Sequence, residues 1–401
     1  MPHVAVVGGG LAGLVAARTL RDHGLSVDVF DKGSCPGGRS CSRIGPGYQF
    51  DHAFSSMLVN DETDPRLLTF LDAWEEAGLL QRWDPQVVKL EGANPTPEPL
   101  DFGDYRLVGV PSSQAIPEFL VDSTLPPLDD RQARERSELV SSGVQIDRIE
   151  LREGQLGGTL LAGERERGGR SFGPYDRIVL ACPPENVDRL LSGLPDEELD
   201  LDAEQADAAL PSGGHRMAPV WTVLLTLEHP LSAPGQNLAY RNHPVMCKAT
   251  CEPDKPRRPA DPRWVLHATP EWTRDHLEDD PKAVVEQMTA AFFDSIDAGR
   301  PAIAEARAHR WRFGLKRPAD AERLEAARQR LRLKGLVLAG DWTNDQGKVS
   351  DGTPGWYGFP NAILSGFEAA GEILRGVHVA AAERSRSLDH DRSEQIEALA
   401  T

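Results

Sequence analysis

The sequence lacks the features that would assign it to several common classes. Its five cysteines form no Cys-x-x-Cys motif, which excludes a thioredoxin-type redox pair and a zinc knuckle. We therefore expect no metal site. No uninterrupted apolar run is long enough to cross a bilayer. Basic residues are too few to balance the acids: 44 Lys and Arg against 62 Asp and Glu give a formal net charge of −18, which disfavours binding to nucleic acid or an anionic membrane.

Size and composition are those of an ordinary globular protein. The 401 residues are enough for two joined domains, and 40% of them are hydrophobic. An odd number of cysteines in a long acidic chain is typical of a reducing cytoplasm. We expect a cytoplasmic monomer or homodimer that acts on a small-molecule substrate, with no nucleic-acid or membrane partner.

The first residues have the pattern of a dinucleotide-binding unit. Residues 3–7 predict a short buried strand, and Gly8, Gly10 and Gly13 follow as G-x-G-x-x-G. These glycines would allow a tight turn, close approach of a pyrophosphate and close packing of the next helix. Leu11 and Ala12 would begin that helix and lie against the pyrophosphate.

A second strand and an acid complete this unit. Residues 11–23 predict the helix, Gly24 would end it, and residues 26–30 predict the next strand. Asp31 stands at the end of that strand, where an acid binds the ribose hydroxyls of ADP, with Lys32 beside it. The order strand, glycines, helix, strand and acid predicts ADP binding.

Two further segments favour FAD over NAD. In the first, Gly38 would let the backbone meet the dinucleotide, and Arg39 could pair with its pyrophosphate. The second lies near the other end of the chain, where residues 335–339 predict a buried strand that ends at Gly340 and Asp341. The acid suits the ribitol hydroxyls of a flavin.

The segment that follows predicts a helix directed at the flavin. Residues 361–375 have an amphipathic pattern, and Asn361 and Ala362 would stand at the helix N-terminus. The positive end of the helix dipole could stabilise the reduced ring.

Together these segments resemble the FAD-dependent amine oxidase superfamily, most closely its renalase-like branch. Further matches are residues 50–52 (FDH), 107–111 (LVGVP), 178–183 (IVLACP), 264–269 (WVLHAT), 309–313 (HRWRF) and 362–366 (AILSG). The resemblance implies an α/β fold, with a Rossmann-like FAD-binding domain of the glutathione-reductase type. An inserted α+β substrate domain would be built on a mixed or antiparallel sheet. Departures at residues 53–55 and 360–361 favour a specialised, biosynthetic substrate.

The motif positions predict a discontinuous organisation. We expect the FAD-binding domain in residues 1–58, 107–190 and 305–380, the substrate domain in 59–106 and 191–304, and a charged tail in 381–401. Residues 123–138 and 251–262, rich in proline and charge, are expected to be solvated loops or lids.

Candidate catalytic residues come from two places. The resemblance implies that Trp356, Tyr357 and Phe359 form an aromatic wall able to stack a planar or cationic substrate, although packing within the loop would explain them equally well. His52 could polarise the substrate or hold the flavin, or it could be a structural histidine.

The chain has no second strand–GxGxxG–helix unit, so we expect electrons to enter from an organic substrate. The leading hypothesis is an FAD-dependent oxidoreductase that takes a hydride from a C–N or activated C–C bond, with oxygen as acceptor. One alternative is a flavin-dependent desaturase or a non-redox isomerase or cyclase. Another is a non-catalytic flavin-binding regulatory protein.

Overall fold

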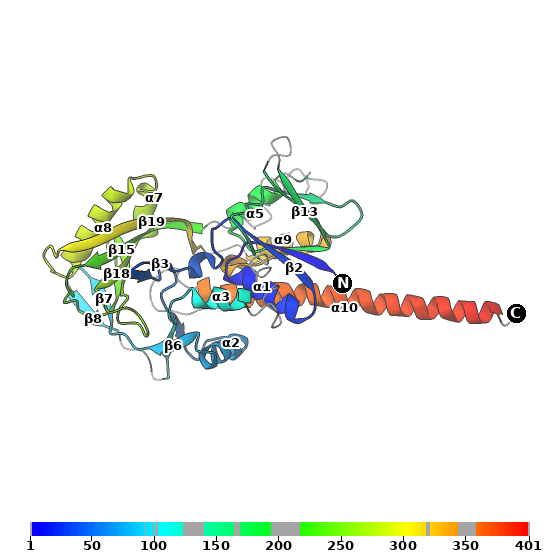
Figure 1. Ribbon diagram of the computed structural model, residues 1–401, viewed down its shortest axis with the longest axis horizontal. Coiled ribbons are helices and arrows are strands. Elements are labelled where there is room, and N and C mark those ends of the chain that lie inside the picture. Colours follow the sequence, from blue (N-terminus) through cyan, green and yellow to red (C-terminus); the bar gives the residue numbers. More distant parts are fainter. Residues whose placement is uncertain are drawn as a thin grey trace.

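The computed structural model describes residues 2–92, 94–98, 101, 103–122, 140–163, 169–192, 194, 217–317, 321–343 and 358–399, with side chains up to residue 378. Within these ranges the chain forms two sheet-based domains (Figure 1). The loop at 123–138, Trp356 and Tyr357 lie outside the described residues.

A five-stranded parallel sheet organises the first domain. Its order is β10 (Val140–Ser142), β2 (Ser26–Asp31), β1 (His3–Val7), β14 (Arg177–Leu180) and β20 (Leu336–Leu338). Because side chains alternate along a strand, β1 supplies both faces: Val4 and Val6 join one apolar cluster, and Ala5 and Val7 join another. Both faces of the sheet are therefore covered, as a parallel sheet requires.

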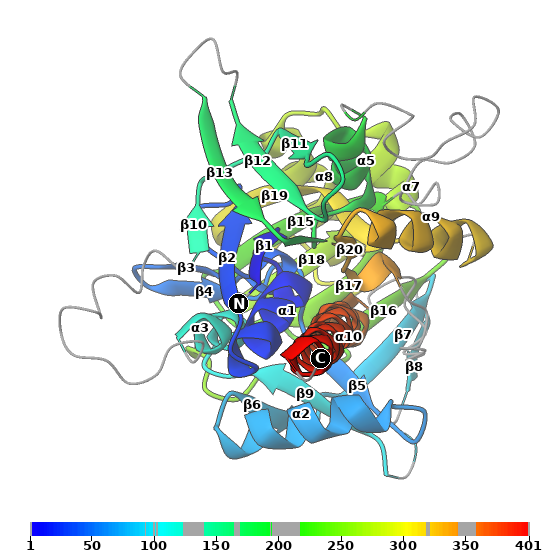
Figure 2. The same cartoon turned by 90° about the vertical axis from the view of Figure 1, so that its right-hand side faces the viewer.

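Two helices from opposite ends of the chain cover one face. They are α1 (Leu11–Asp22) and α10 (Gly358–Leu399), which lie side by side in Figure 2. A Cβ added to Gly366 of α10 would lie 2.4 Å from the carbonyl oxygen of Ala12, so the two backbones approach closely at this point. The helix expected at 361–375 is thus present, but it begins earlier and continues through the expected tail.

The other face is covered by a small antiparallel sheet and two helices. The sheet consists of β11 (Arg148–Leu151), β12 (Gly158–Ala162) and β13 (Arg170–Tyr175), and the helices are α5 (Pro184–Leu191) and α9 (Ala321–Leu333). Residues from these elements share one apolar cluster with the parallel sheet.

A seven-stranded sheet forms the second domain. Its order is β19 (Ile303–Lys316), β15 (Met217–Leu227), β18 (Arg263–Ala268), β17 (Met246–Cys251), β16 (Asn237–Arg241), β7 (Val87–Glu91) and β8 (Asn94–Pro97). The β16–β7 pair is parallel and the other pairs are antiparallel, so the sheet is mixed. Helices α7 (Pro270–Asp275) and α8 (Pro281–Ser295) pack against it.

Smaller elements lie where the domains meet. A hairpin is formed by β3 (Arg43–Gly45) and β4 (Tyr48–Phe50), and a three-stranded sheet by β5 (Met57–Val59), β9 (Tyr105–Gly109) and β6 (Leu80–Trp83). Near them lie α2 (Pro65–Glu76), α3 (Ala115–Asp122) and the short turn η1 (Gly38–Ser40). The Asp64 side chain caps α2 by accepting from the backbone N–H of Arg66, an interaction typical of helix N-termini.

The expected fold class is confirmed: an α/β architecture with a Rossmann-like domain and a second domain on a mixed sheet. One boundary needs correction. Residues 305–316 were expected in the nucleotide-binding domain, yet they belong to β19, which pairs with β15 along its length. These residues were expected in the nucleotide-binding domain because they precede β20 in the sequence. Sequence order, however, does not show which strand a segment pairs with.

The segment 251–262 also differs from the expected solvated loop. Asp51 Oδ2 lies 3.2 Å from Lys255 Nζ and 2.5 Å from Arg258 Nη2, and Glu252 Oε1 lies 2.5 Å from Lys255 Nζ. All four side chains are at most 2% exposed. We call these residues the buried charge cluster. They hold the loop against the start of the 51–55 segment, because a buried charge must be paired.

Candidate functional site

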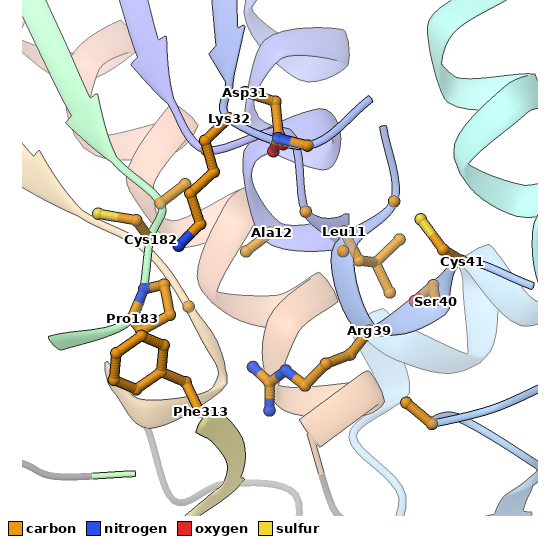
Figure 3. Close-up of a pocket in the computed structure, with 18 of the residues that line it drawn as sticks. Leu11, Ala12, Asp31, Lys32, Arg39, Ser40, Cys41, Cys182, Pro183 and Phe313 are labelled. Carbon is orange, nitrogen blue, oxygen red and sulfur yellow. The ribbon is translucent and has the colours of Figure 1, made fainter. Parts of the chain in front are cut away.

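A cavity of about 660 Å³ opens at the carboxyl edge of the parallel sheet. This is within the usual size range of ligand sites, about 300–1,000 Å³. It is lined by the turn after β1, the end of β2, residues 37–43 and 52–54, residues 309–315 of β19, and the start of α10 (Figure 3). Segments from both ends of the chain therefore meet around one space.

The three glycines of the first turn occupy different surroundings. A Cβ on Gly8, whose φ is 116°, would lie 2.5 Å from the carbonyl oxygen of Ala181, and one on Gly13 would lie 2.0 Å from the carbonyl oxygen of Gly8. A Cβ on Gly10 would meet nothing within 4 Å. Gly8 and Gly13 are thus needed for turn and packing, whereas Gly10 leaves room for a ligand to approach the backbone.

The N-terminus of α1 faces the cavity. Leu11 and Ala12 line it, and the N-cap residue Gly10 provides no side-chain cap. The uncapped N–H groups at this helix end and the positive end of its dipole suit a phosphate.

Asp31 is held at the rim by the glycine turn. Its Oδ2 accepts a hydrogen bond from the N–H of Gly9 at 2.5 Å, and its Oδ1 accepts from the N–H of Gly33 at 2.6 Å. A carboxylate has further lone pairs, so each oxygen can still accept a hydroxyl. Lys32 extends from the same strand end across the cavity, with Nζ 5.8 Å from the centre of the Phe313 ring (Figure 3).

Arg39 and Asp341 form an ion pair in which Asp341 is buried and the Arg39 side chain is 32% exposed. The distances are 2.7 Å for Nη1–Oδ2 and 2.5 Å for Nη2–Oδ1, and Arg39 Nη1 also donates to the carbonyl oxygen of Gly314 at 3.1 Å. Burial opposes the charge on Arg39, but the Asp341 carboxylate outweighs it and the pKa of Arg39 is raised. The sequence predicted separate contacts for these residues with pyrophosphate and ribitol; the structure places them against each other at the cavity wall.

The start of α10 closes this end of the cavity. Gly358, Phe359 and Ala362 line it, and the N–H of Gly340 donates to Ser365 Oγ at 2.9 Å, which ties the helix to the turn after β20. Asn361 is buried in the same helical turn but does not line the cavity. Of the thirteen expected cofactor-binding residues, eleven line the cavity; Gly13 and Asn361 do not.

Phe359 is largely occupied by packing. Its ring stacks on Phe54 with centroids 4.0 Å apart and an interplanar angle of 15°, and Trp74 lies 6.5 Å away. Only 5% of Phe359 is exposed. The residue lines the cavity, but little of its ring is free to contact a substrate, and its role in an aromatic wall stays a prediction.

His52 forms the centre of a ring cluster at the cavity wall. The ring centroids of His309 and Trp311, both on β19, lie 4.9 Å from that of His52. Trp311 Nε1 donates to the backbone oxygen of His52 at 3.3 Å, and His267 Nε2 lies 3.3 Å from the same oxygen. Nδ1 of His52 is buried and has no hydrogen-bond partner among the described residues. Buried polar atoms are nearly always hydrogen-bonded, so Nδ1 of His52 is a candidate to bind a ligand.

The imidazoles of this cluster are neutral at physiological pH. Burial first, and then the neighbouring His309 and Arg43, lower the pKa of His52 to about 3. Burial and Arg43 lower the pKa of His309 to about 4, and burial followed by Lys248 lowers that of His267 to about 3. Neutral imidazoles can accept or donate one hydrogen bond without carrying charge.

Sequence reasoning did not assign Arg43, His309 or Trp311 to the cavity. Arg43 Nη2 lies 3.3 Å from His309 Nδ1, and all three residues line the cavity. A signal was available: rings at 309, 311 and 313 alternate along one strand, so they share one face. The partner element that this face meets could not be read from the sequence.

Comparisons with known proteins agree with this geometry. The family model described as an NAD(P)-binding Rossmann-like domain matches residues 6–74. Similar solved structures include wild-type putrescine oxidase bound to putrescine, with 15% identity, TM-score 0.64 and coverage of 93% of this chain and 99% of that one. A reduced UDP-galactopyranose mutase gives 12% identity, TM-score 0.69 and coverage of 93% and 94%. A protein described as a putative protoporphyrinogen oxidase from Exiguobacterium sp. 255-15 gives 17% identity, a TM-score of 0.62 and coverage of 93% of this chain and 98% of that one.

At these identities the comparisons show the fold. The chain has a Rossmann-like nucleotide-binding domain with an inserted second domain, and the arrangement extends over nearly the whole length of these proteins. Across the described ranges, every helix is too short or too polar to cross a membrane.

Proposed function

We propose that the chain is an FAD-dependent oxidoreductase that oxidises a small organic substrate at a C–N or activated C–C bond. The observation that carries this proposal is that one cavity is lined by both ends of the chain. The glycine turn and Asp31 stand at one side, and Asp341 with the start of α10 stands at the other. A mononucleotide or ADP alone would not need Asp341 and the start of α10.

The cavity residues fit FAD in their chemistry. Asp31 would accept the ribose hydroxyls, the N-terminus of α1 and Lys32 would face the pyrophosphate, and the Arg39–Asp341 pair would meet the ribitol. The residues proposed to hold FAD are Gly8, Gly10, Leu11, Ala12, Asp31, Lys32, Gly38, Arg39, Gly340, Asp341 and Ala362, with Gly13 and Asn361 in supporting positions. When bound, FAD supplies hydride acceptance at N5 of its ring.

The chain's own residues would orient the substrate and exclude water. Phe54 and Trp311 supply apolar walls, with Phe359 stacked on Phe54, and Nδ1 of His52 is available for one hydrogen bond to the substrate. His52 would act in its neutral form, since its pKa lies far below physiological pH. This role is positioning through a hydrogen bond and needs no charge on the imidazole.

Finer aspects of the proposal rest on the sequence motifs. We place the chain in the amine oxidase superfamily, nearest its renalase-like branch, with oxygen as the electron acceptor. We further propose a cytoplasmic monomer or homodimer, and a biosynthetic role for the reaction.

The first experiment asks which dinucleotide binds. Purified protein should take up FAD and become yellow, and NAD should not compete. Anaerobic mixing with benzylamine, putrescine and a dihydronicotinamide should then identify a donor that bleaches the flavin band. Turnover without bleaching would favour a non-redox isomerase. A protein that binds NAD and refuses FAD would overturn the proposal.

A variant pair tests the second half of the site. Asp341→Asn should weaken FAD binding about 10- to 100-fold, because a charge-assisted bond is worth about 1.5–3 kcal/mol and Arg39 loses its carboxylate partner. Asp72→Asn, an exposed acid on α2, is the matched control and should leave FAD binding unchanged. Flavin fluorescence during titration measures both. Equal affinities for the two variants would contradict the assigned role.

A further inference from the structure

The charges around the cavity are unequal. Six basic side chains line it, namely Lys32, Arg39, Arg43, Arg189, Arg310 and Arg312. Among the residues that the structure describes, only two carboxylates do so, those of Asp31 and Asp341. Whatever occupies the cavity meets a surplus of positive charge.

Most of these cations already have partners. Arg39 pairs with Asp341, as described above. Arg189 Nη1 lies 3.3 Å from Asp147 Oδ1, and Nη2 donates to the carbonyl oxygen of Ile146 at 3.0 Å. Arg310 and Arg312 share one exposed acid, Glu278, at 2.6 and 2.8 Å, respectively. Arg39 and Arg189 are thus each balanced by one acid, whereas Arg310 and Arg312 together keep one positive charge in excess.

Lys32 and Arg43 are the two cavity cations for which no acidic partner has been described above. Neither has a carboxylate within 4 Å in the described part of the chain. Lys32 follows Asp31 and belongs with the nucleotide end of the cavity. Arg43 begins the β3–β4 hairpin and approaches the ring cluster on the other side, where its Nη2 lies 3.3 Å from His309 Nδ1. The two cations thus serve different parts of the cavity.

The surroundings of Arg43 form a built site for an anion. Its guanidinium stands beside His309, and His52 next to them is 2% exposed, with its Nδ1 lacking a partner among the described residues. The guanidinium donates through a fork that matches a carboxylate, and a neutral imidazole donates from the one ring nitrogen that carries its proton. A cationic group placed here would meet the charge of Arg43, and Asp51, whose charge acts on His52, is already paired with Lys255 and Arg258.

We propose that the substrate carries a carboxylate, which binds at Arg43 beside His52 and His309. This deepens the proposed function and rests on it, since the cavity must also hold FAD. A simple amine, positively charged before oxidation, would be a poor substrate unless it also bears an acidic group. Arg43 is the anchor of this subsite and His52 supplies its second hydrogen bond.

Three ligands of one shape test the proposal. Benzoate, benzamide and benzylamine share a phenyl ring and are similar in size, but carry charges of −1, 0 and +1 at neutral pH. Their dissociation constants for the FAD-loaded protein can be measured by calorimetry, which does not depend on turnover. We expect benzoate to bind about tenfold or more tightly than benzamide, and benzylamine to bind most weakly, because the free guanidinium favours a negative partner.

Variants then assign the effect to one side chain. Arg43→Gln should weaken benzoate binding about tenfold or more and leave benzamide within about twofold, whereas Arg43→Lys should retain part of the preference because it keeps the charge without the fork. Arg274→Gln removes an exposed arginine of α7 outside the cavity and controls for net charge.

Several outcomes would overturn the inference alone: equal binding of the three ligands, tighter binding of benzylamine, or an Arg43→Gln variant whose FAD affinity falls while its ligand preference is unchanged. Failure of the wild-type protein to bind FAD would instead overturn the proposed function, and the substrate assignment with it. Measuring FAD uptake first keeps the two results apart.

Discussion

The buried charge cluster should be the most sensitive point of the second domain. With both carboxyls ionised, Asp51 and Glu252 balance the two positive charges of Lys255 and Arg258. Burial, which outweighs the two cations, raises the pKa of Glu252. Asp51→Asn keeps the shape but leaves one positive charge in excess, out of contact with water. Breaking a buried ion pair from one side costs about 3–5 kcal/mol, and we expect a loss of this size in the free energy of unfolding.

A second substitution should restore part of that loss. Lys255→Met alone leaves an excess negative charge and should be similarly destabilising. The double variant retains only Glu252 and Arg258, which are again neutral together. Its cost should therefore fall short of the sum of the single costs by about 1–3 kcal/mol, the usual range for residues in one network.

Urea unfolding followed by tryptophan fluorescence at pH 7 measures these costs. The surface pair Arg332–Glu372, at 2.8 Å with the arginine 56% exposed, provides the comparison: Glu372→Gln should cost less than about 1 kcal/mol. The neighbouring cations, after the opposing effect of burial, hold the pKa of Asp51 below its usual range. Its contribution is therefore complete at pH 7 and is lost as the pH falls below the ordinary carboxyl value, so the deficit of Asp51→Asn should shrink there. Strict additivity, or a cost for Asp51→Asn no larger than that of the surface pair, would refute the reasoning.

Two other predictions concern the glycine turn and the histidines. Gly10→Ala should keep the stability of the wild-type protein but lose FAD uptake, because its Cβ enters open cavity space. Gly13→Ala should destabilise the fold, because its Cβ would overlap a backbone oxygen. Calorimetric unfolding with a flavin titration separates the two effects, and equal stability of both variants would contradict the prediction. The folded-state pKa values of His52, His267 and His309 lie below the unfolded value of about 6.5, so the unfolded chain binds more protons and stability should fall as the pH drops from about 6.5 to 4. His267→Asn should reduce that slope by up to about 1.4 kcal/mol per pH unit, as measured by urea unfolding at pH 7 and 5; an unchanged slope would argue against a neutral buried His267.

Local patterns made the nucleotide-binding end predictable. The strand, glycine turn, helix and Asp31 are adjacent in sequence, and the local backbone geometry requires the residue type found at each position. The turn after β20 and the helix that follows it were predictable for the same reason, because Asp341 follows a short apolar run and the helix has a clear period.

Relations between distant segments were not predictable. Nothing local indicates that Arg39 pairs with Asp341, 302 positions away, or that the last strand before β20 joins the other domain's sheet. The charges at 251–262 look solvated in the sequence, since their burial depends on Asp51, which lies 201–207 positions earlier. The ion pair, the strand pairing and the burial of residues 251–262 all depend on contacts between distant segments. A single sequence does not show which distant segments come into contact.

The contact between α1 and α10 has a consequence for synthesis. The glycine turn and Asp31 are translated well before α10 (Gly358–Leu399), the helix that covers them and closes the cavity. At about 5–20 residues per second, the interval from residue 31 to residue 375 is roughly 20–70 s. During that time one apolar face of the parallel sheet lacks its final cover. The nascent protein is thus most vulnerable to aggregation before α10 docks. Chaperone engagement should help during that interval, whereas an excess of flavin should help only once α10 has closed the cavity.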